Sequence, residues 1–242
     1  MKTPILGIKI DSVSFEEAIE KIDHFVCGKI PSQIVTLNPE FIMAAQKDRV
    51  FKKILNQVDL AIPDGFGLML AASYLGKSLK ERITGVDLTW AICKLAEDRG
   101  YSVFFLGGSK GVAKETARRI QKIHNRLKIA GVYSGKPDDT ETVSKIEQAK
   151  PDILLVAFGA PKQDKFIYDL IHSKDTFHPS FSMGVGGTFD YIAGRVSRAP
   201  KWMRTFGLEW LYRLIKQPNR LGRIYTATIR FPIAVILAKI RS

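Results

Sequence analysis

The chain has 242 residues, of which 45% are hydrophobic, and it carries a net charge of +13. This length allows one full hydrophobic core, or a core with an appendage, and the composition is not that of a low-complexity chain. The two cysteines form neither a CxxC pair nor a disulfide framework, which favours a reducing cytoplasm. The N-terminal apolar run is too short for a signal peptide, and no stretch reaches the roughly 18 uncharged apolar residues of a membrane-spanning helix.

Strand-like and helix-like segments alternate through the first hundred residues. Strands are predicted at 4–10, 33–38 and 58–65, where apolar residues predominate. Helices are predicted at 14–26, 39–48, 65–76 and 86–100. Ser14 and Glu17 have the spacing of a capping box, and Pro39 suits a first helical turn. These signals place each helix start shortly after a strand.

The same alternation continues to residue 187. Apolar runs at 101–108, 127–135, 152–161 and 179–187 predict buried strands, and helices are predicted between them at 111–124, 139–150 and 162–173. Strands buried on both faces that alternate with helices indicate a parallel sheet. We therefore predict an α/β fold with a Rossmann-like, mostly parallel sheet and helices on both of its faces.

The pattern changes near Gly194. Beyond it the chain is aromatic, basic and helix-like, and prolines at 200, 218 and 232 interrupt it. Eleven Lys and Arg residues face a single acid, Glu209, so this segment carries +10 of the net charge. We predict an α/β domain at 1–194 and a helical, basic appendage at 195–242. The charge indicates an anionic partner, which is a phosphate, a nucleic acid or an anionic lipid.

Asp64 stands at the C-terminal end of a predicted strand, in the sequence AIPDGFG. Ligands of parallel α/β sheets bind beyond the C-terminal strand ends, so a carboxylate there is placed for general-base catalysis. An aspartate that caps the following helix explains the same residue equally well. The sequence leaves both interpretations open.

Further polar residues fall near the same edge of the predicted sheet. Thr36 and Asn38 lie two apart on a strand and project to one face, although a helix cap also explains Asn38. Arg82 lies in a loop, where an arginine is usually solvated. Gln163 lies in the first turn after a strand end, from which an amide can contact a ligand. None of these residues identifies a ligand by itself.

The appendage has two competing interpretations. One face of its helical pattern carries four basic residues, Arg213, Lys216, Arg220 and Arg223, although Pro218 must kink or split the helix. Aromatic residues and the run FPIAVILAKI supply apolar surface. The segment is either an amphipathic pair that packs on the body or an interfacial membrane segment. Nucleic acid offers nothing against which the aliphatic end could be buried, so no nucleic-acid partner is predicted.

Neither a metal site nor a cofactor is predicted. The four histidines lack ligand spacing, and the chain has no DxD pair of carboxylates to hold Mg²⁺ or Mn²⁺ on a nucleotide sugar. A diphosphate substrate then needs another neutralising group. Arginine guanidinium groups suit phosphates because they bind them through two hydrogen bonds at once.

Six stretches in one order span nearly the whole chain: TLNPEF, PDGFG, RITGVDL, FFLGG, GAPKQD and GVGGTFDYIAGRVSRAPKWMRTFGLEWLYRLIKQPNR. Together they resemble the WecG/TagA/CpsF glycosyltransferases, and within that family the N-acetylmannosaminyltransferases of wall teichoic acid synthesis. The resemblance implies transfer of N-acetylmannosamine from its UDP donor to N-acetylglucosamine on undecaprenyl diphosphate. It further implies a β-1,4 product, made without a metal by a peripheral enzyme on the cytoplasmic membrane face.

The resemblance also implies roles for the residues that fall in these motifs. Asp64 is expected to be the base that takes the proton of the acceptor hydroxyl. Thr36, Asn38 and Arg82 are expected to hold the sugar or the acceptor. Gln163 and Asp190 are expected to contact the donor.

Three arginines of the appendage, Arg213, Arg220 and Arg223, are expected to approach the diphosphate and stabilise the departing UDP. The predicted partners are therefore a UDP-sugar donor, a lipid-diphosphate-linked sugar acceptor and an anionic membrane surface. Alternatives are a relative that uses another donor, such as UDP-N-acetylmannosaminuronic acid, and a non-catalytic subunit, which the presence of Asp64 disfavours. A nucleic-acid binder is a more distant alternative.

Overall fold

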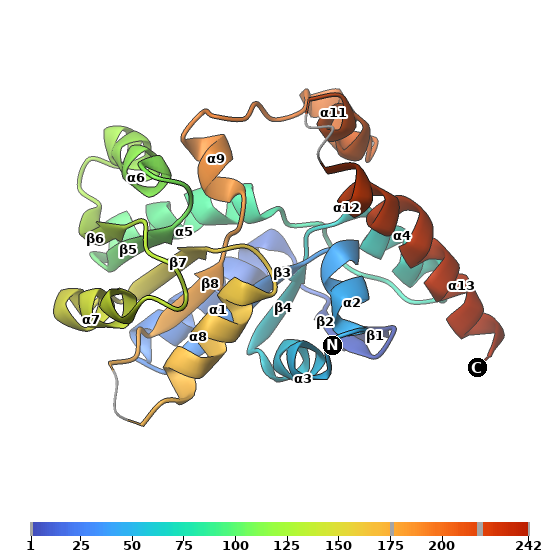
Figure 1. Ribbon diagram of the computed structural model, residues 1–242, viewed down its shortest axis with the longest axis horizontal. Coiled ribbons are helices and arrows are strands. Elements are labelled where there is room, and N and C mark those ends of the chain that lie inside the picture. The colour runs from blue at the N-terminus through green and yellow to red at the C-terminus, as the bar shows by residue number, and fades with distance from the viewer. Residues whose placement is uncertain (1, 175–176, 217–219, 242) are drawn as a thin grey trace.

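The chain begins with a two-stranded hairpin and continues into a six-stranded parallel sheet. The computed structural model describes residues 2–174, 177–216 and 220–241 (Figure 1). The hairpin pairs β1 (Lys2–Ile5) with β2 (Ile8–Asp11) in antiparallel register. It corrects the single strand predicted at 4–10. Leu6 and Gly7 both adopt positive φ, +48° and +75°, which is the backbone of a tight hairpin turn.

The large sheet has the strand order β4–β3–β8–β7–β5–β6, and all its pairs are parallel. Its strands are those predicted from the apolar runs: β3 (Ser32–Leu37), β4 (Leu60–Pro63), β5 (Ser102–Gly107), β6 (Lys128–Tyr133), β7 (Ile153–Ala157) and β8 (Phe181–Gly184). The predicted α/β fold with a Rossmann-like parallel sheet is therefore confirmed.

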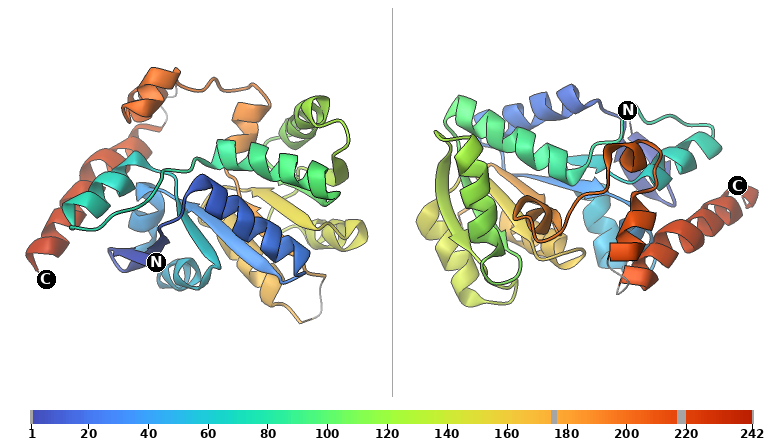
Figure 2. Two further views of the ribbon diagram at one scale, coloured as in Figure 1. Left: turned by 180° about the vertical axis from the view of Figure 1, so that it is seen from behind. Right: turned by 90° about the horizontal axis from the view of Figure 1, so that it is seen from above.

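Helices cover both faces of this sheet (Figures 1 and 2). One face packs against α1 (Phe15–Cys27), α5 (Gly85–Arg99), α6 (Val112–Ile123) and α9 (Thr188–Ile192). The other face packs against α2 (Pro39–Ala45), α3 (Arg49–Gln57), α7 (Thr140–Ala149) and α8 (Lys162–His172). Helix α4 (Phe66–Tyr74) packs beside α2 and the hairpin. The sheet is thus buried on both faces, as its continuous apolar strands require.

The order of the strands determines where the site forms. Strands β4, β3, β8 and β7 are neighbours although they come from distant parts of the chain. Because they are parallel, the turns that follow them meet at one edge of the sheet. The polar and glycine residues after these four strands are thereby brought together.

All regular secondary structure in the described part of the appendage is helical. These are α10 (Lys201–Thr205), α11 (Glu209–Lys216), α12 (Leu221–Tyr225), a π-helical turn (Thr226–Arg230) and α13 (Phe231–Ile240). Phe231 and Val235 are 1% and 3% exposed and join the core formed by α2, α3, α4 and the hairpin. The opposite side of α13 exposes Ile233, Ile236 and Leu237. One side of the last helix therefore packs on the body and the other does not.

Pro232 does not interrupt the last helix, contrary to the expectation from the sequence. Residues Leu221–Ile240 form one continuous helix in which the π turn directly precedes α13. A proline has no N–H, and its ring crowds the carbonyl group of residue i−4, here Thr228. The wider π turn, which contains Thr228, gives that carbonyl room. Pro218 lies outside the described residues.

Candidate active site

A polar cavity of about 160 Å³ opens at the C-terminal edge of the sheet. The ends of β3 and β4 contribute Thr36, Asn38 and Asp64 to its wall. The turns after β7 and β8 contribute glycines, and the appendage closes the opposite side with Arg198, Glu209, Arg220 and Arg223. The cavity therefore lies between the body and the appendage.

A second cavity, of about 390 Å³, adjoins the first. The two share Asn38, Asp64 and Glu209 in their walls. The second cavity runs between α4 and the continuous helix α12–α13, which lie side by side in Figures 1 and 2. These two cavities meet at the shared carboxylates.

Asp64 ends β4, and its backbone N–H donates to the carbonyl of Leu37 at 2.7 Å. Its carboxylate Oδ2 accepts the N–H of Gly85, the first residue of α5, at 3.4 Å. The N-terminus of α5 therefore favours the charged carboxylate through its dipole. The cap of the following helix is Gly65, which makes no side-chain cap bond. The N-cap position of α4 thus belongs to Gly65, the described bond of the Asp64 carboxylate goes to α5 instead, and Asp64 lines both cavities.

Thr36 and Asn38 both lie at this edge, as their spacing predicted. Thr36 is 7% exposed and lines the polar cavity. The Asn38 Oδ1 accepts the backbone N–H groups of Glu40 at 2.9 Å and Phe41 at 3.2 Å, so Asn38 caps α2. It lines both cavities as well. The cap fixes the orientation of Asn38 next to Asp64.

Gln163 joins two loops of the site. Its side chain is buried, and Oε1 accepts the N–H groups of Gly159 and Gly186, each at 3.0 Å. These glycines lie after β7 and β8, so one side chain holds both turns in place. A Cβ on Gly184 would approach Gln163 Nε2 closely, so this position needs a glycine. Gln163 lines the polar cavity, and its carbonyl oxygen is already used by the protein.

Arg82 and Asp190 lie apart from this group. Arg82 lines the second cavity rather than the polar one. Asp190 lies in α9 and is not among the residues that line either cavity, whereas its neighbour Tyr191 lines the polar one. The carbonyl of Asp190 accepts the N–H groups of Arg195 and Val196 at 2.9 and 3.3 Å. The structure therefore brings Arg82, but not Asp190, to the cavity walls.

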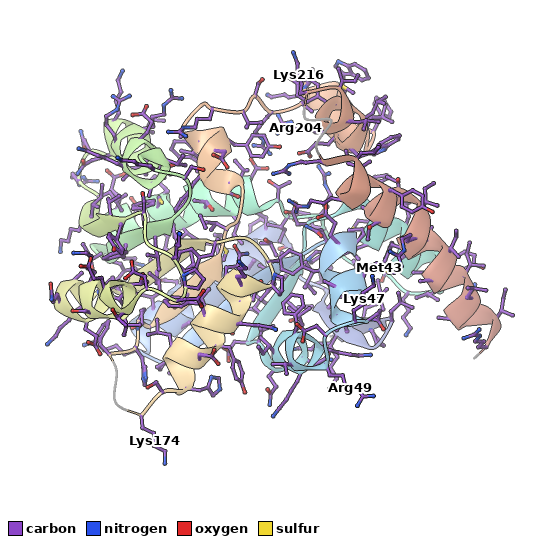
Figure 3. All side chains as sticks on the ribbon, in the orientation of Figure 1. Met43, Lys47, Arg49, Lys174, Arg204 and Lys216 are labelled. Atoms are coloured by element: carbon purple, nitrogen blue, oxygen red, sulfur yellow. The ribbon has the colours of Figure 1, made fainter. Side chains whose placement is uncertain are left out.

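Two of the three predicted arginines line the polar cavity. Arg220 lies beside the turn at Gly187, because its Nη2 atom would be 3.6 Å from a Cβ added to that glycine. Arg223 Nε lies 2.5 Å from Glu40 Oε2, in an exposed ion pair. Arg213 belongs to α11, but its side chain lies outside the described part of the structure. In Figure 3 two other basic residues, Arg204 and Lys216, lie at the same end of the molecule, around α11.

Arg198 is a cavity residue that the sequence did not identify. Its Nη1 and Nη2 atoms bind the Asp87 carboxylate at 2.6 and 3.1 Å, and Nη2 also lies 3.3 Å from Thr84 Oγ1. Burial opposes the charge on Arg198, but the hydrogen bonds and charge of Asp87 outweigh it and raise the pKa of Arg198. Burial would raise the pKa of Asp87, but hydrogen bonds from Arg198 and Thr84 outweigh it and lower that pKa. This pair ties the appendage to the N-terminus of α5.

Glu209 is the second residue that the sequence did not identify. It begins α11 and lines both cavities together with Asp64. It is also the single acid among the eleven cations that follow Gly194. An isolated acid in a basic segment is the sequence signal that points to this residue.

Among residues 2–174, 177–216 and 220–241, no three His, Cys, Asp or Glu side chains gather closely enough to hold a metal ion. One described helix, Leu221–Ile240, is long and apolar enough to cross a membrane by length and composition, with a mean hydropathy of 1.4. The sequence did not indicate it because Arg230 interrupts the apolar run.

Comparison with known proteins agrees with this geometry. The model of the glycosyl transferase WecG/TagA/CpsF family matches residues 3–242. The chain is 37% identical over 212 residues to an N-acetylglucosaminyldiphosphoundecaprenol N-acetyl-beta-D-mannosaminyltransferase of Bacillus subtilis, covering 87% of this chain and 81% of that protein. A Staphylococcus aureus protein of the same name is 31% identical over 244 residues, which cover 99% and 95% of the two chains. The chain therefore belongs to the WecG/TagA/CpsF glycosyltransferase family.

Proposed function

We propose that this chain transfers N-acetylmannosamine from UDP-N-acetylmannosamine to N-acetylglucosamine on undecaprenyl diphosphate. The product is the β-1,4-linked disaccharide of the teichoic acid linkage unit. The observation that carries this proposal is the carboxylate of Asp64, which lines both cavities. A donor sugar in the polar cavity and an acceptor sugar in the second cavity would meet at that carboxylate.

The proposed reaction is a single in-line displacement. The C4 hydroxyl of the acceptor attacks C1 of the donor sugar while Asp64 takes the hydroxyl proton. The bond between C1 and the β-phosphate oxygen breaks, and its electron pair leaves with UDP. One displacement inverts the anomeric centre, so an α-linked donor gives a β-linked product. A positioned carboxylate base contributes about 10²–10⁴-fold to such a rate.

Arginine side chains take the role of neutralising the leaving diphosphate in this proposal. Arg220 and Arg223 line the polar cavity on its appendage side, which supports the assignment. Fixed positive charge beside a departing phosphate stabilises the transition state without reorganisation of water. Arg213 retains this role by family resemblance alone. The reaction as proposed uses no metal ion.

The other predicted residues receive positioning roles. Thr36 and Asn38 line the polar cavity beside Asp64 and are proposed to orient the reacting sugars. Arg82 is proposed to hold the acceptor, since it lines the second cavity. Gln163 is proposed to shape the donor side through the two glycine turns that it holds. Asp190 keeps a proposed donor contact from family resemblance.

The enzyme is proposed to be peripheral on the cytoplasmic face of the membrane. The appendage, residues 195–242, is the proposed membrane-associating unit, and residues 1–194 are the catalytic unit. Exposed apolar side chains of α13 together with Arg230 and Lys239 support this placement. Basic residues near an anionic surface each contribute on the order of 1 kcal/mol of attraction.

A donor screen with a lipid-diphosphate-linked N-acetylglucosamine acceptor tests the proposal. Release of UDP is measured with UDP-N-acetylmannosamine, UDP-N-acetylglucosamine and UDP-N-acetylmannosaminuronic acid. We expect rapid release only with the first donor, and only when the acceptor is present. Preference for the acidic donor would assign a different reaction, and no release with any donor would favour a non-catalytic subunit. Sedimentation with anionic liposomes, but no retention on DNA, is expected for the chain.

A further inference from the structure

The second cavity has walls of two kinds. The wall that it shares with the polar cavity is polar and consists of Asn38, Asp64 and Glu209, and Glu40 and Arg82 also line it. The apolar part of its wall comes from α4, α11 and the continuous C-terminal helix, with Phe66, Leu70, Trp210, Ile224, Ala227 and Pro232. A ligand that fits both parts must itself be amphiphilic, with a polar head and a hydrocarbon part.

The apolar part of the wall leads to an exposed apolar surface. Leu70 and Tyr74 of α4 are 58% and 45% exposed, and Ile233 and Leu237 of the neighbouring α13 are 51% and 47% exposed. Such a patch on two adjacent helices is a site where apolar partners bind. The cavity is thus continuous, along one pair of helices, from the catalytic carboxylate to a surface that favours hydrocarbon.

We propose that the cavity between α4 and α12–α13 binds the first isoprene units of a polyprenyl diphosphate, with the lipid chain leaving along the exposed surface of α4 and α13. Arg82 lines this cavity and offers a positive charge to the diphosphate, while Arg223 pairs with Glu40, one of the three acidic residues in its wall. The inference rests on the proposed function for the identity of the head group. It adds the site and the direction of the lipid.

The size of the cavity limits how much lipid it holds. Its volume of about 390 Å³ lies at the lower end of the roughly 300–1,000 Å³ range of small-molecule sites. It therefore takes a few isoprene units, and the rest of the chain remains outside, against α13 or in a membrane. We accordingly expect affinity to rise with chain length over the first units and then to level off.

The π turn shapes the wall of this cavity. Ala227 and Thr228 both lie in the turn and line the cavity, and Ala227 carries only a methyl group. On the facing side Gly67 lines the cavity next to Phe66. π turns inside α-helices are frequent at functional sites. Ala227 lines this cavity and not the polar one, so a larger side chain at position 227 would reduce the volume of this cavity.

The test compares two soluble diphosphates that differ in hydrocarbon length. Isopentenyl diphosphate has one isoprene unit, farnesyl diphosphate has three, and their charged groups are the same. Binding to the full-length protein is followed by calorimetry and by the change in tryptophan fluorescence, to which Trp210 in the cavity wall contributes together with Trp90 and Trp202. We expect farnesyl diphosphate to bind at least about tenfold more tightly, since each buried CH₂ group adds to the affinity.

Two variants test whether the tighter binding of farnesyl diphosphate arises in this cavity. Ala227→Phe fills the cavity and is expected to remove the advantage of farnesyl over isopentenyl diphosphate. Ala238→Phe adds the same side chain at an exposed position of α13 and is expected to keep that advantage. Equal affinities of the wild-type protein for both diphosphates, or equal losses in both variants, would overturn the inference.

The binding test is independent of the proposed reaction. If farnesyl diphosphate is preferred but no sugar is transferred to any acceptor, the lipid site stands and the proposed function fails. If sugar is transferred but neither chain length nor Ala227→Phe changes binding, the proposed function stands and the lipid site fails.

Discussion

The two sides of the polar cavity are built in different ways. On the body side, Thr36 and Gln163 are 7% and 2% exposed and are held by the sheet and by buried hydrogen bonds. On the appendage side, Arg223 lies in the first turn of the continuous helix Leu221–Ile240, and its side chain is 56% exposed. The body side is therefore preorganised, whereas the position of the appendage side depends on how α11–α13 are docked.

The largest effect is expected on the body side. Asp64→Asn keeps the shape of the side chain and removes the base, so kcat should fall about 10³-fold. The measurement is UDP release with the lipid-linked acceptor at saturating donor. The variant should keep a melting temperature close to that of the wild-type protein, because asparagine retains a side-chain oxygen that can accept the N–H of Gly85. Wild-type turnover in this variant would remove Asp64 from the mechanism.

The next effect concerns the packing of α13 on the body and is measured as a free energy of unfolding. Phe231→Ala removes a buried ring between α13 and the body and should lower the free energy of unfolding by about 3–5 kcal/mol. Ile233→Ala, on the exposed side of the same helix, is the matched control and should lower it by less than about 1 kcal/mol. Urea unfolding measures both. Equal losses would mean that α13 does not dock as described.

The appendage side should contribute to catalysis itself. Arg220→Ala removes a positive charge beside the turn at Gly187 and should lower kcat about 10²-fold. Arg223→Ala should lower it by only about tenfold, because this exposed arginine already pairs with Glu40. Both variants are assayed at saturating substrates. Wild-type kcat in Arg220→Ala would show that the body side alone provides catalysis.

The free energy of unfolding is expected to depend on pH through a buried residue of the body, Asp164. Asp164 is fully buried, and neither carboxylate oxygen has a hydrogen-bond partner in the described structure. Burial raises its pKa to about 8. The folded protein therefore keeps a proton that the unfolded chain releases above about pH 4, so wild-type stability falls as pH rises from about 4 to 8.

Asp164→Asn removes this dependence. From pH 5 to pH 7 the free energy of unfolding of the variant should rise by on the order of 2 kcal/mol relative to that of the wild-type protein. Urea unfolding at the two pH values measures this change. An equal stability difference at both pH values would show that Asp164 is charged in the folded protein. Gln33 Oε1 and Ser182 Oγ are also buried without hydrogen-bond partners in the described structure. Gln33 Nε2 donates to the backbone carbonyl of Asp164, the residue that follows Gln163, at 2.9 Å.

The smallest effect concerns the membrane. Arg230→Gln and Lys239→Gln should each weaken binding to anionic liposomes by about 1 kcal/mol, and less at high salt. Lys174→Gln is the control, because Lys174 lies at the far end of the molecule from α11 and α13 (Figure 3). Liposome sedimentation measures all three. An equal loss in the control would mean that net charge, and not the appendage, directs binding.

The sequence predicted the sheet well because its strands are continuous apolar runs between clear helix signals. It missed the hairpin because Leu6 adopts positive φ, which a leucine rarely does and no pattern indicates. It missed the continuity of the last helix because a π turn accommodates Pro232. Both errors arise where local geometry departs from what the residue types favour.

The candidate site was predicted where residues stand at strand ends, as with Thr36, Asn38 and Asp64. Their meeting follows from parallel strands alone. Arg198 and Glu209 could not be placed, because their positions depend on how the appendage folds back over the sheet. The role of Gln163 as a link between two turns was equally invisible, since Gly159 and Gly186 are far apart in sequence.

The stereochemistry of the product tests the central claim most directly. The full chain is incubated with UDP-N-acetylmannosamine and polyprenyl-diphosphate-linked N-acetylglucosamine, and the disaccharide is examined by NMR for its anomeric configuration. A single displacement with Asp64 as base predicts a β-linked product and one UDP released for each disaccharide formed. An α-linked product would mean retention, and it would contradict both the single-base mechanism and the meeting of donor and acceptor at one carboxylate.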